Sequence, residues 1–551
     1  MNAHTKYLLF LLFSFVSFVT FAQVETIYIE KDCGFWTQRN LKLSEYTSNV
    51  PFKKLPSFNI QKVLLEEDET DKTHQDIFRY GIPFETNYSF QDGTWYNTEQ
   101  GRLWALTITA SESKFLNFLF TDVRLPDGAY IFIFNREKNV MIGNITQQCV
   151  NKNGNILTDL LPGSSATIFL YEPEEVRGVS RITIEKAIYG YRDISLGQEK
   201  SDVFRSFGDA SSCNIDVACK PVYSNESNAV GILLESNGYV RGTGSLLMST
   251  DRSFTPYFLT AFHSIDLDDN NEISLMEKIA ISDISIKFNY KKATCEGNTL
   301  STSVTYSGLS YTASWGRDHT DFALLKLNEN VKNNPYLYYL GWDRSGSTPT
   351  SGACIHHPKG DVMKISIENS SFQSSKWQDN YGYTSQSNDH WKVYFDEGIT
   401  EGGSSGAPIL NQNKRVVGQL HGGIAHDNPC NNTDALFGKF SISWLGGGMT
   451  SNQLRYWLDP NNTGATTMDG SYPPGLQAEI VGDPVICNAN TYTLTGVPSI
   501  YTIQWSLSNT TDFSVTPGAD STCVVSFVGS GETSTVLTAR VYFSINDYNL
   551  F

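Results

Sequence analysis

The chain has 551 residues, a length that predicts three or four domains rather than one. Its 58 Asp and Glu residues outnumber the 41 Lys and Arg residues, which gives a net charge of −17. This balance argues against nucleic-acid binding, because that function calls for a basic patch. Aromatic residues make up 13% of the chain and charged residues only 18%, which favours a β-rich exported protein over a helical cytosolic enzyme.

Residues 1–22 are predicted to form a signal peptide. Lys6 supplies positive charge, and an apolar run follows from Tyr7 to Phe21. Ala22 then places a small residue before an expected cut at Gln23. Because this apolar run is short for a membrane helix, we expect a secreted protein without a membrane span.

Residues 23–207 are predicted to be β-rich and to carry no pairing of a nucleophile with a base. Their strand-like runs include L-W-A-L-T-I-T-A, G-A-Y-I-F-I-F-N and A-T-I-F-L-Y-E-P. These runs combine β-branched and aromatic residues and are bounded by turn signals such as L-P-D-G. Two interpretations are open: a removable pro-region, which we favour, or an independent β-sandwich that stays in the mature protein.

Three motifs further along the chain carry the residues of a catalytic triad. The run P-Y-F-L-T-A-F-H-S ends in His263, and in H-T-D-F-A-L-L-K-L Asp321 directly precedes an apolar strand. The run G-G-S-S-G-A-P places Ser405 in a tight glycine-rich loop. Each motif alone has an ordinary structural reading, but their order is that of chymotrypsin-type triads. Their spacing suits two successive small barrels.

The chemistry assigns a role to each of these residues. Ser405 would attack a carbonyl, and His263 would take its proton and later donate it to the leaving amine. Asp321 would fix the imidazole tautomer and stabilise its cation. The N–H groups of Gly403 and Ser405 would form the oxyanion hole.

From about Cys213 to Gly470 the sequence resembles the bacterial lysyl endopeptidases of the chymotrypsin-like superfamily. The matching blocks are S-C-N-I-D-V-A-C, G-T-G-S-L, Y-F-L-T-A-F-H, D-F-A-L-L-K-L, G-W-D-R, I-H-H-P, G-S-S-G-A-P, V-V-G-Q-L-H-G-G and W-L-D-P. The resemblance implies an all-β fold with a chymotrypsin-like double antiparallel β-barrel at residues 208–470. It also implies a pro-region at residues 23–207.

The function that this resemblance implies is a secreted serine endopeptidase that cleaves on the carboxyl side of lysine or another basic residue. The alternatives are a glutamyl-specific endopeptidase of the same superfamily and an inactive relative that serves as an adhesion protein. The expected partners are protein or peptide substrates, with the pro-region as an intramolecular partner. No cofactor is required for this chemistry.

Substrate preference is expected to depend on an acidic residue beyond Ser405. Ile399 occupies the position where trypsin carries its pocket carboxylate, so the trypsin arrangement is absent. In the resembling family the charge comes from an aspartate after the H-G-G strand, and the best match is Asp434, with Asp427 as the runner-up. The alternative is that both are turn residues.

The same resemblance implies a role for the strand that ends in H-G-G. His421 replaces the tryptophan of the usual S-W-G strand, and its ring is expected to stack on Trp377. The backbone from Leu420 to Gly422 would pair with the substrate as an added strand. Ser404 stands where trypsin-like zymogens carry an aspartate, so we expect activation by loss of the pro-region rather than by insertion of a new N-terminus.

Nine cysteines in an exported chain predict disulfides and one thiol left over. The resemblance implies the pairs Cys213–Cys430 and Cys219–Cys295. Two further pairs, each inside one domain, are Cys33–Cys149 and Cys487–Cys523. Cys354 is then the odd residue, expected as a buried free thiol.

An acidic loop at residues 266–277 matches the calcium-loop pattern at Asp266, Asp268, Asn270 and Glu277. Asn271 stands at the usual glycine, and asparagine tolerates the left-handed conformation that this position needs. Oxygen ligands in this pattern suit a hard cation. The loop is therefore either a structural calcium site or a plain acidic surface loop.

The prolines and glycine of S-Y-P-P-G predict a linker at residues 471–475. Short strands and polar turns follow, including T-Y-T-L, T-I-Q-W-S-L and S-T-V-L-T-A-R-V-Y-F. Their spacing predicts an immunoglobulin-like β-sandwich at residues 476–551, which may be truncated.

Overall fold

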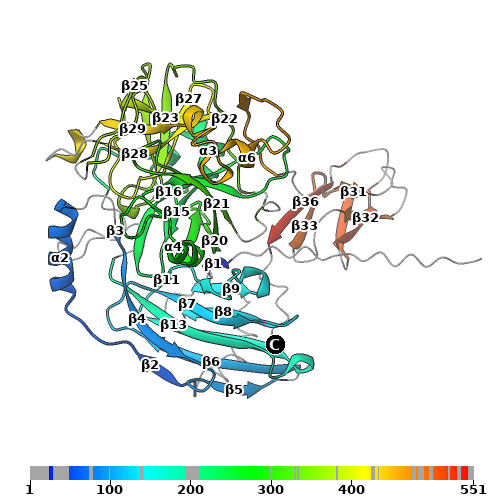
Figure 1. Ribbon diagram of the computed structural model, residues 1–551. Helices are drawn as coiled ribbons and strands as arrows, with labels where there is room; N and C mark the ends of the chain where they lie inside the picture. Colours follow the sequence, from blue (N-terminus) through cyan, green and yellow to red (C-terminus); the bar gives the residue numbers. More distant parts are fainter. Residues whose placement is uncertain are drawn as a thin grey trace, which may run out of the picture. The chain divides into compact units, whose positions relative to one another are not determined.

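A computed structural model shows a chain built mostly from β-strands (Figure 1). It describes residues 24–28, 49–73, 78–98, 100–135, 140–192, 210–297, 299–327, 331, 334, 336–379, 382–423, 428–431, 433–473, 479–481, 489–495, 501–518, 521–529, 535 and 537–543. The predicted boundaries at 22/23 and 207/208 lie outside these residues. No helix among the described residues is long and apolar enough to span a membrane.

The N-terminal segment, residues 49–192, consists of two sheets and one helix. Its strands are β2 (Phe52–Lys54), β3 (Phe78–Arg79), β4 (Gly81–Tyr88), β5 (Thr94–Asn97), β6 (Gly101–Thr109), β7 (Phe115–Arg124), β8 (Tyr130–Asn135), β9 (Val140–Ile145), β10 (Ile156–Leu157), β11 (Leu161–Pro162), β12 (Ser165–Pro173) and β13 (Arg181–Gly190). The helix is α2 (Ile60–Thr73). The three runs predicted as strands are confirmed, because they form β6, β8 and β12.

The central segment, residues 210–473, contains two sheets that follow each other along the chain. The strands of the first are β15 (Val230–Leu234), β16 (Tyr239–Leu247), β17 (Tyr257–Ala261), β18 (Ser285–Phe288), β19 (Val304–Ser307), β20 (Leu309–Trp315) and β21 (Phe322–Leu327). They lie in the order β19-β18-β15-β16-β17-β21-β20, and every neighbouring pair is antiparallel.

The second central sheet runs in the order β14-β24-β23-β27-β28-β29-β26-β25, with β22 beside β28 and β30 beside β22. Its strands are β14 (Ile215–Asp216), β22 (Trp342–Asp343), β23 (Gly352–His356), β24 (Lys364–Glu368), β25 (Gln373–Ser375), β26 (His390–Tyr394), β27 (Pro408–Asn411), β28 (Val416–Gly423), β29 (Asp434–Lys439) and β30 (Thr467–Met468). The helices of the central segment are short: α3 (Ser224–Ser227), α4 (Leu275–Ala280), α5 (Phe440–Ser443) and α6 (Arg455–Leu458).

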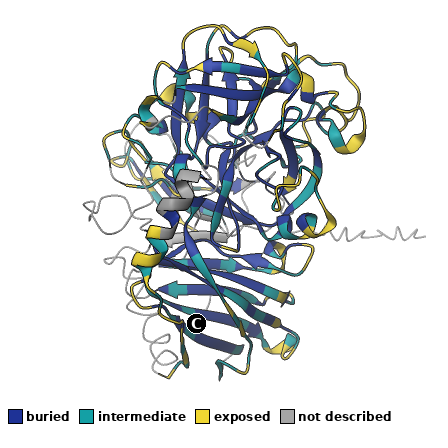
Figure 2. Cartoon of the chain, turned by 60° about the vertical axis from the view of Figure 1, so that its left-hand side comes forward, coloured by how far each residue is buried: buried dark blue, intermediate teal, exposed yellow. Residues whose placement is uncertain are grey.

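A common core joins the two central sheets. Leu259 and Phe322 of the first sheet lie in one buried cluster with Ile355 and Leu410 of the second. Burial of this kind contributes about 25 cal/mol for each Å² of apolar surface removed from water. The strands are therefore mostly buried and the exposed residues gather in turns (Figure 2). Packing of these apolar side chains holds the two central sheets together.

One of the two N-terminal sheets is continuous with the first central sheet. Strand β1 (Val24–Tyr28) lies between β9 and β19, and β3 pairs with β16 through Phe78 and Val240. A buried ion pair crosses the same contact, where Lys287 Nζ lies 2.7 Å from an Asp159 carboxylate oxygen. A mixed apolar cluster includes Phe78 and Leu160 from one segment and Val240 from the other.

The described residues from Glu479 to Phe543 belong to a compact unit separate from residues 24–473. Its strands are β31 (Glu479–Val481), β32 (Ala489–Thr495), β33 (Tyr501–Leu507), β34 (Phe513–Pro517), β35 (Thr522–Phe527) and β36 (Leu537–Phe543). One sheet has the order β31-β32-β35-β34, and β33 pairs with β36. Trp505 of β33 shares a buried cluster with Leu494 and Val525 of the other sheet, so the two sheets pack together. The immunoglobulin-like assignment stays a prediction.

Candidate active site

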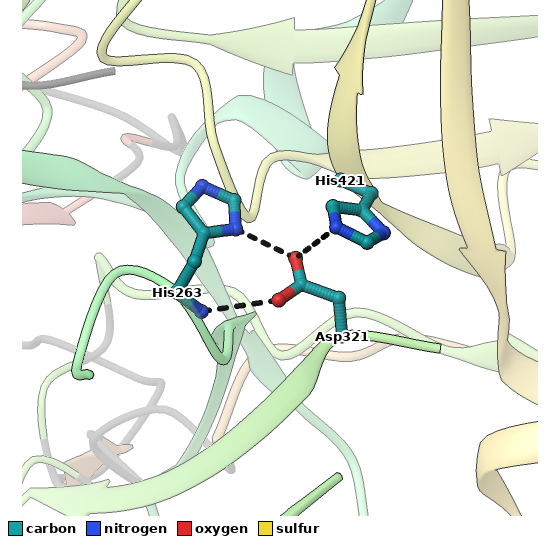
Figure 3. Close-up of side chains that lie close together, drawn as sticks. All are labelled: His263, Asp321 and His421. Atoms are coloured by element: carbon teal, nitrogen blue, oxygen red, sulfur yellow. Dashed lines mark hydrogen bonds and ion pairs between the residues drawn. The ribbon is translucent and has the colours of Figure 1, made fainter. Parts of the chain in front are cut away.

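His263 and Asp321 are brought together by the pairing of β17 with β21. Ala261 lies opposite Phe322, so the chain just beyond β17 meets the residue just before β21. The Phe262 N–H donates to the Asp321 carbonyl at 2.8 Å. The His263 N–H donates to Asp321 Oδ1 at 3.1 Å, and His263 Nδ1 lies 2.7 Å from Asp321 Oδ2 (Figure 3). The fully buried carboxylate therefore holds both the backbone and the ring of the histidine.

The loop before β27 carries Ser405 to the edge of the first sheet. The Thr243 N–H donates to the Ser405 carbonyl at 2.8 Å. A side chain at Gly242 would meet that carbonyl at 2.6 Å and Ser264 Oγ at 2.9 Å, so Ser405 lies beside the residue that follows His263. Gly406 has φ +82°, and a Cβ there would lie 2.3 Å from Thr260 Oγ1. Only glycine fits that position.

The predicted oxyanion hole consists of two backbone N–H groups of this loop. Gly403 has φ +90°, and its carbonyl accepts from Thr243 Oγ1 at 2.8 Å, which fixes the peptide plane. Within the described part of the chain, neither the Gly403 N–H nor the Ser405 N–H donates to a protein acceptor. An oxyanion hole needs N–H groups of this kind, and the assignment of these two stays a prediction.

Ser404 is tied into the protein by contacts that the sequence does not reveal. It is fully buried, and its Oγ lies 2.7 Å from His356 Nδ1 and accepts the Glu401 N–H at 3.3 Å. Burial lowers the pKa of His356 to about 3, so this ring is neutral. The Glu401 carboxylate in turn accepts the Ser211 N–H at 2.9 Å and Asn214 Nδ2 at 2.7 Å. The Glu401 carboxylate, three residues before Ser404, therefore connects this loop to the start of the central segment.

His421 lies against the triad, and its ring stacks on Trp377 as the resemblance implied. The ring centroids are 3.8 Å apart with an interplanar angle of 19°. A Cβ on Gly422 would lie 2.6 Å from the same indole, so glycine allows the close approach. His421 Nε2 lies 3.8 Å from Asp321 Oδ2. Burial is the first cause, and neighbouring positive groups the second, of a His421 pKa well below its ordinary value.

Sequence reasoning missed the two residues behind His421. His390 Nε2 lies 3.0 Å from His421 Nδ1, and His390 Nδ1 lies 2.6 Å from Asp389 Oδ1. His390 is the first residue of β26, and Asp389 directly precedes it. No local spacing signals their contact with His421.

The predicted pocket residue Asp434 is the first residue of β29 and is buried. Its backbone carbonyl lies beside Gly423, at the end of the strand that carries His421. Its carboxylate is 3.5 Å from Lys392 Nζ, an ion pair that the sequence did not predict. The runner-up, Asp427, lies outside the described residues.

Both disulfides implied by the resemblance are present, Cys213–Cys430 and Cys219–Cys295. Cys354 is a buried free thiol in β23, as expected. The predicted pair Cys487–Cys523 is wrong, because Cys523 is a buried free thiol. The pair Cys33–Cys149 stays a prediction, since Cys33 lies outside the described residues.

Two groups of side chains have the residue types and spacing of metal ligands. His263, Asp321 and His421 have ligand atoms within 4.8 Å of one another, as do Asp266, Asp268 and Glu277. The first group is accounted for by the triad geometry. The second is the predicted calcium loop, in which Asn271 has φ 64°, the expected left-handed conformation.

Protein donors already occupy much of that loop. Asp266 accepts the N–H groups of Asn270 and Asn271, and Arg317 Nη2 lies 3.9 Å from it. Glu277 accepts the N–H groups of Leu267 and Ser274, the latter in a capping box at the start of α4. Acceptors used in this way have fewer lone pairs left for a cation.

A chelator is therefore expected to leave the melting temperature unchanged. A cation bound only to the folded state at about a hundred times its dissociation constant would add roughly 2.7 kcal/mol, a visible shift. The measurement is thermal unfolding in EDTA with and without excess calcium. A melting temperature that falls in EDTA and returns with calcium would make the loop a calcium site.

Part of the chain is similar to a known protein family. Residues 207–438 match the model of the lysyl endopeptidase C-terminal domain. This segment is therefore similar to the C-terminal domain of lysyl endopeptidases. The match covers less than half of the chain and includes His263, Asp321, Ser405, His421 and Asp434. The all-β class predicted for it is confirmed by the sheets of this segment.

A curated lysyl endopeptidase from Pseudomonas aeruginosa is 24% identical over 323 residues, which cover 54% of this chain and 62% of the relative. The chain thus matches less than two thirds of that relative's length. Among solved structures, a Glu endopeptidase in complex with MPD is 18% identical, with a TM-score of 0.27, and covers 42% of this chain and 92% of that one. A mutant of Rv3671c from M. tuberculosis H37Rv, in its inactive form, is 15% identical, with a TM-score of 0.26, and the match covers 40% of this chain and 86% of that one.

Proposed function

We propose that the protein is a serine endopeptidase that cleaves on the carboxyl side of lysine or another basic residue. The observation that carries the proposal is the His263–Asp321 pair, at 2.7 Å, beside a glycine-rich loop that presents Ser405. The similarity of residues 207–438 to the lysyl endopeptidase C-terminal domain supports the same chemistry.

The geometry supports a stepwise acyl transfer. Ser405 Oγ attacks the peptide carbonyl while His263 Nε2 takes the hydroxyl proton, and Asp321 stabilises the imidazolium that forms. The N–H groups of Gly403 and Ser405 stabilise the oxyanion. His263 then gives the proton to the leaving amine, and water repeats the attack on the acyl-enzyme.

The preference for lysine rests on Asp434. A buried carboxylate is costly without a cation nearby, and in the free protein Lys392 partly supplies that charge. A substrate ammonium entering beside Asp434 would join this pair as a second cation. The β28 backbone around His421 would hold the substrate chain as an added strand.

Export is proposed for the same protein. The signal-like residues 1–22 and two disulfides support it, because disulfides persist in oxidising compartments. Removal of residues 23–207 as a pro-region is part of the proposal.

Two measurements test the function. A fluorophosphonate reagent that labels nucleophilic serines is expected to label the mature protein on Ser405, whereas an inactive adhesion protein would stay unlabelled. Matched lysyl, arginyl, glutamyl and alanyl ester substrates then give the preference. We expect lysyl esters to react fastest; preferential glutamyl cleavage would overturn the lysyl assignment.

A further inference from the structure

A buried chain of polar side chains extends from the triad carboxylate into the second central sheet. It runs from Asp321 to His421, then to His390 and Asp389. His390 is fully buried, and the side chains of His421 and Asp389 are at most 5% exposed. Polar groups at this depth need partners for nearly every donor and acceptor. Their donor and acceptor roles are therefore constrained.

Asp389 acts as an acceptor at both carboxylate oxygens. The Ser385 hydroxyl donates to Oδ1 at 2.7 Å, and the Gln386 N–H donates to Oδ2 at 2.9 Å. Because Asp389 already accepts at both oxygens, His390 Nδ1, 2.6 Å from Oδ1, is the donor of the third bond.

The contact between the two histidines has two possible directions. If His421 Nδ1 donated to His390, the neutral His421 ring would turn the lone pair of Nε2 toward the Asp321 carboxylate, 3.8 Å away. Two electron-rich atoms facing each other in a buried site repel. If His390 Nε2 donates instead, His421 keeps its proton on Nε2 and presents an N–H dipole to Asp321. The second direction is the favourable one.

The charges around His421 agree with this direction. His390, His263 and Arg317 each oppose a positive charge on His421, which, with burial, keeps it neutral. In this direction both ring nitrogens of His390 donate, Nδ1 to Asp389 and Nε2 to His421. Lys439 follows on β29, where its N–H donates to the Asp389 carbonyl at 2.9 Å. Trp377 covers the open face of His421 and carries no charge.

We propose that Asp389 and His390 are positioning residues of the catalytic site, which fix His421 as the Nε2–H tautomer facing Asp321. At 3.8 Å the contact is longer than a hydrogen bond, so it acts as a dipole beside a carboxylate. That dipole partly offsets the negative charge of Asp321. It also opposes rotation of the Asp321 carboxylate away from His263. The inference rests on the proposed function and adds two residues to it.

The direct test reads the tautomer in the unaltered protein. Selective ¹⁵N-histidine labelling of the nine histidines, with His421→Gln to assign the signals, distinguishes a protonated Nε2 from a protonated Nδ1. We expect the proton of His421 on Nε2. A proton on Nδ1 would overturn the proposal, whatever the activity of any variant.

Two variants test the consequence for catalysis. His390→Phe keeps an aromatic ring but removes the donor, and we expect roughly tenfold lower kcat/KM on a lysyl ester with KM little changed. The acid limb of the kcat/KM profile should move to higher pH, because Asp321 then stabilises the His263 cation more strongly. His390→Gln can still donate through its amide and is expected to restore most of the rate and the wild-type pH profile.

The outcomes separate the two hypotheses. Equal losses in His390→Phe and His390→Gln at unchanged melting temperature, or an unmoved acid limb, would show that the ring acts only by packing and overturn the positioning role. A wild-type protein that neither hydrolyses esters nor reacts with the fluorophosphonate would instead refute the proposed function. The tautomer measurement stands in either case.

Discussion

Replacing Ser405 with alanine is expected to give a folded protein that has lost its peptidase activity. The substitution removes only a hydroxyl from a loop that is held by the Thr243–Ser405 backbone bond and by Gly406. Loss of a triad nucleophile typically lowers turnover on the order of a millionfold. The measurement is hydrolysis of a lysyl ester together with fluorophosphonate labelling. If processing is autocatalytic, this variant should also keep residues 23–207 attached.

Ser404→Ala is the matched control in the same loop. Its hydroxyl contacts His356 and the Glu401 N–H rather than the substrate, so we expect reduced stability but retained labelling. Near-normal activity of Ser405→Ala, or complete loss of labelling in Ser404→Ala alone, would contradict the assignment of the nucleophile.

Asp434→Asn is expected to lower kcat/KM for lysyl substrates on the order of a hundredfold, the effect of about 3 kcal/mol of lost pairing with a buried cation. Reaction with a small neutral reagent should change little, because the triad is untouched. The ratio of lysyl to alanyl ester hydrolysis is the measurement. It separates loss of preference from loss of catalysis.

Lys392→Met is the control for the pocket. It removes the cation that lies 3.5 Å from Asp434, so the carboxylate becomes more available to a substrate ammonium. We expect lysyl cleavage to be retained or increased. If Asp434→Asn kept full lysyl cleavage, Asp434 would not be the residue that pairs with the substrate ammonium. Asp427 would then be tested next.

The parts of the site that sequence could predict are those set by adjacent residues along a strand. His263 follows β17 and Asp321 precedes β21, so a strand-edge motif predicts the position of each residue. The Trp377–His421 stack and the two disulfides came from the resemblance, which supplies long-range pairs that local patterns lack.

The remaining contacts depend on tertiary packing that no local pattern encodes. Asp389 and His390 look like an ordinary strand start, and their role appears only where β26 brings them to His421. Glu401 was passed over for a similar reason, because its partners lie near residue 211. In the acidic loop the pattern could not tell ligand oxygens from acceptors of backbone N–H groups.

A single backbone cut between residues 192 and 210 would leave two fragments that stay associated through non-covalent contacts. The β3–β16 pairing, the mixed core around Phe78 and the Lys287–Asp159 ion pair all lie outside the cut. Separating the fragments would leave the two charges without their partners, at a cost of several kcal/mol before rehydration. Maturation would then depend on dilution or on further digestion of the N-terminal fragment, and the nicked protein would elute at the size of the intact chain.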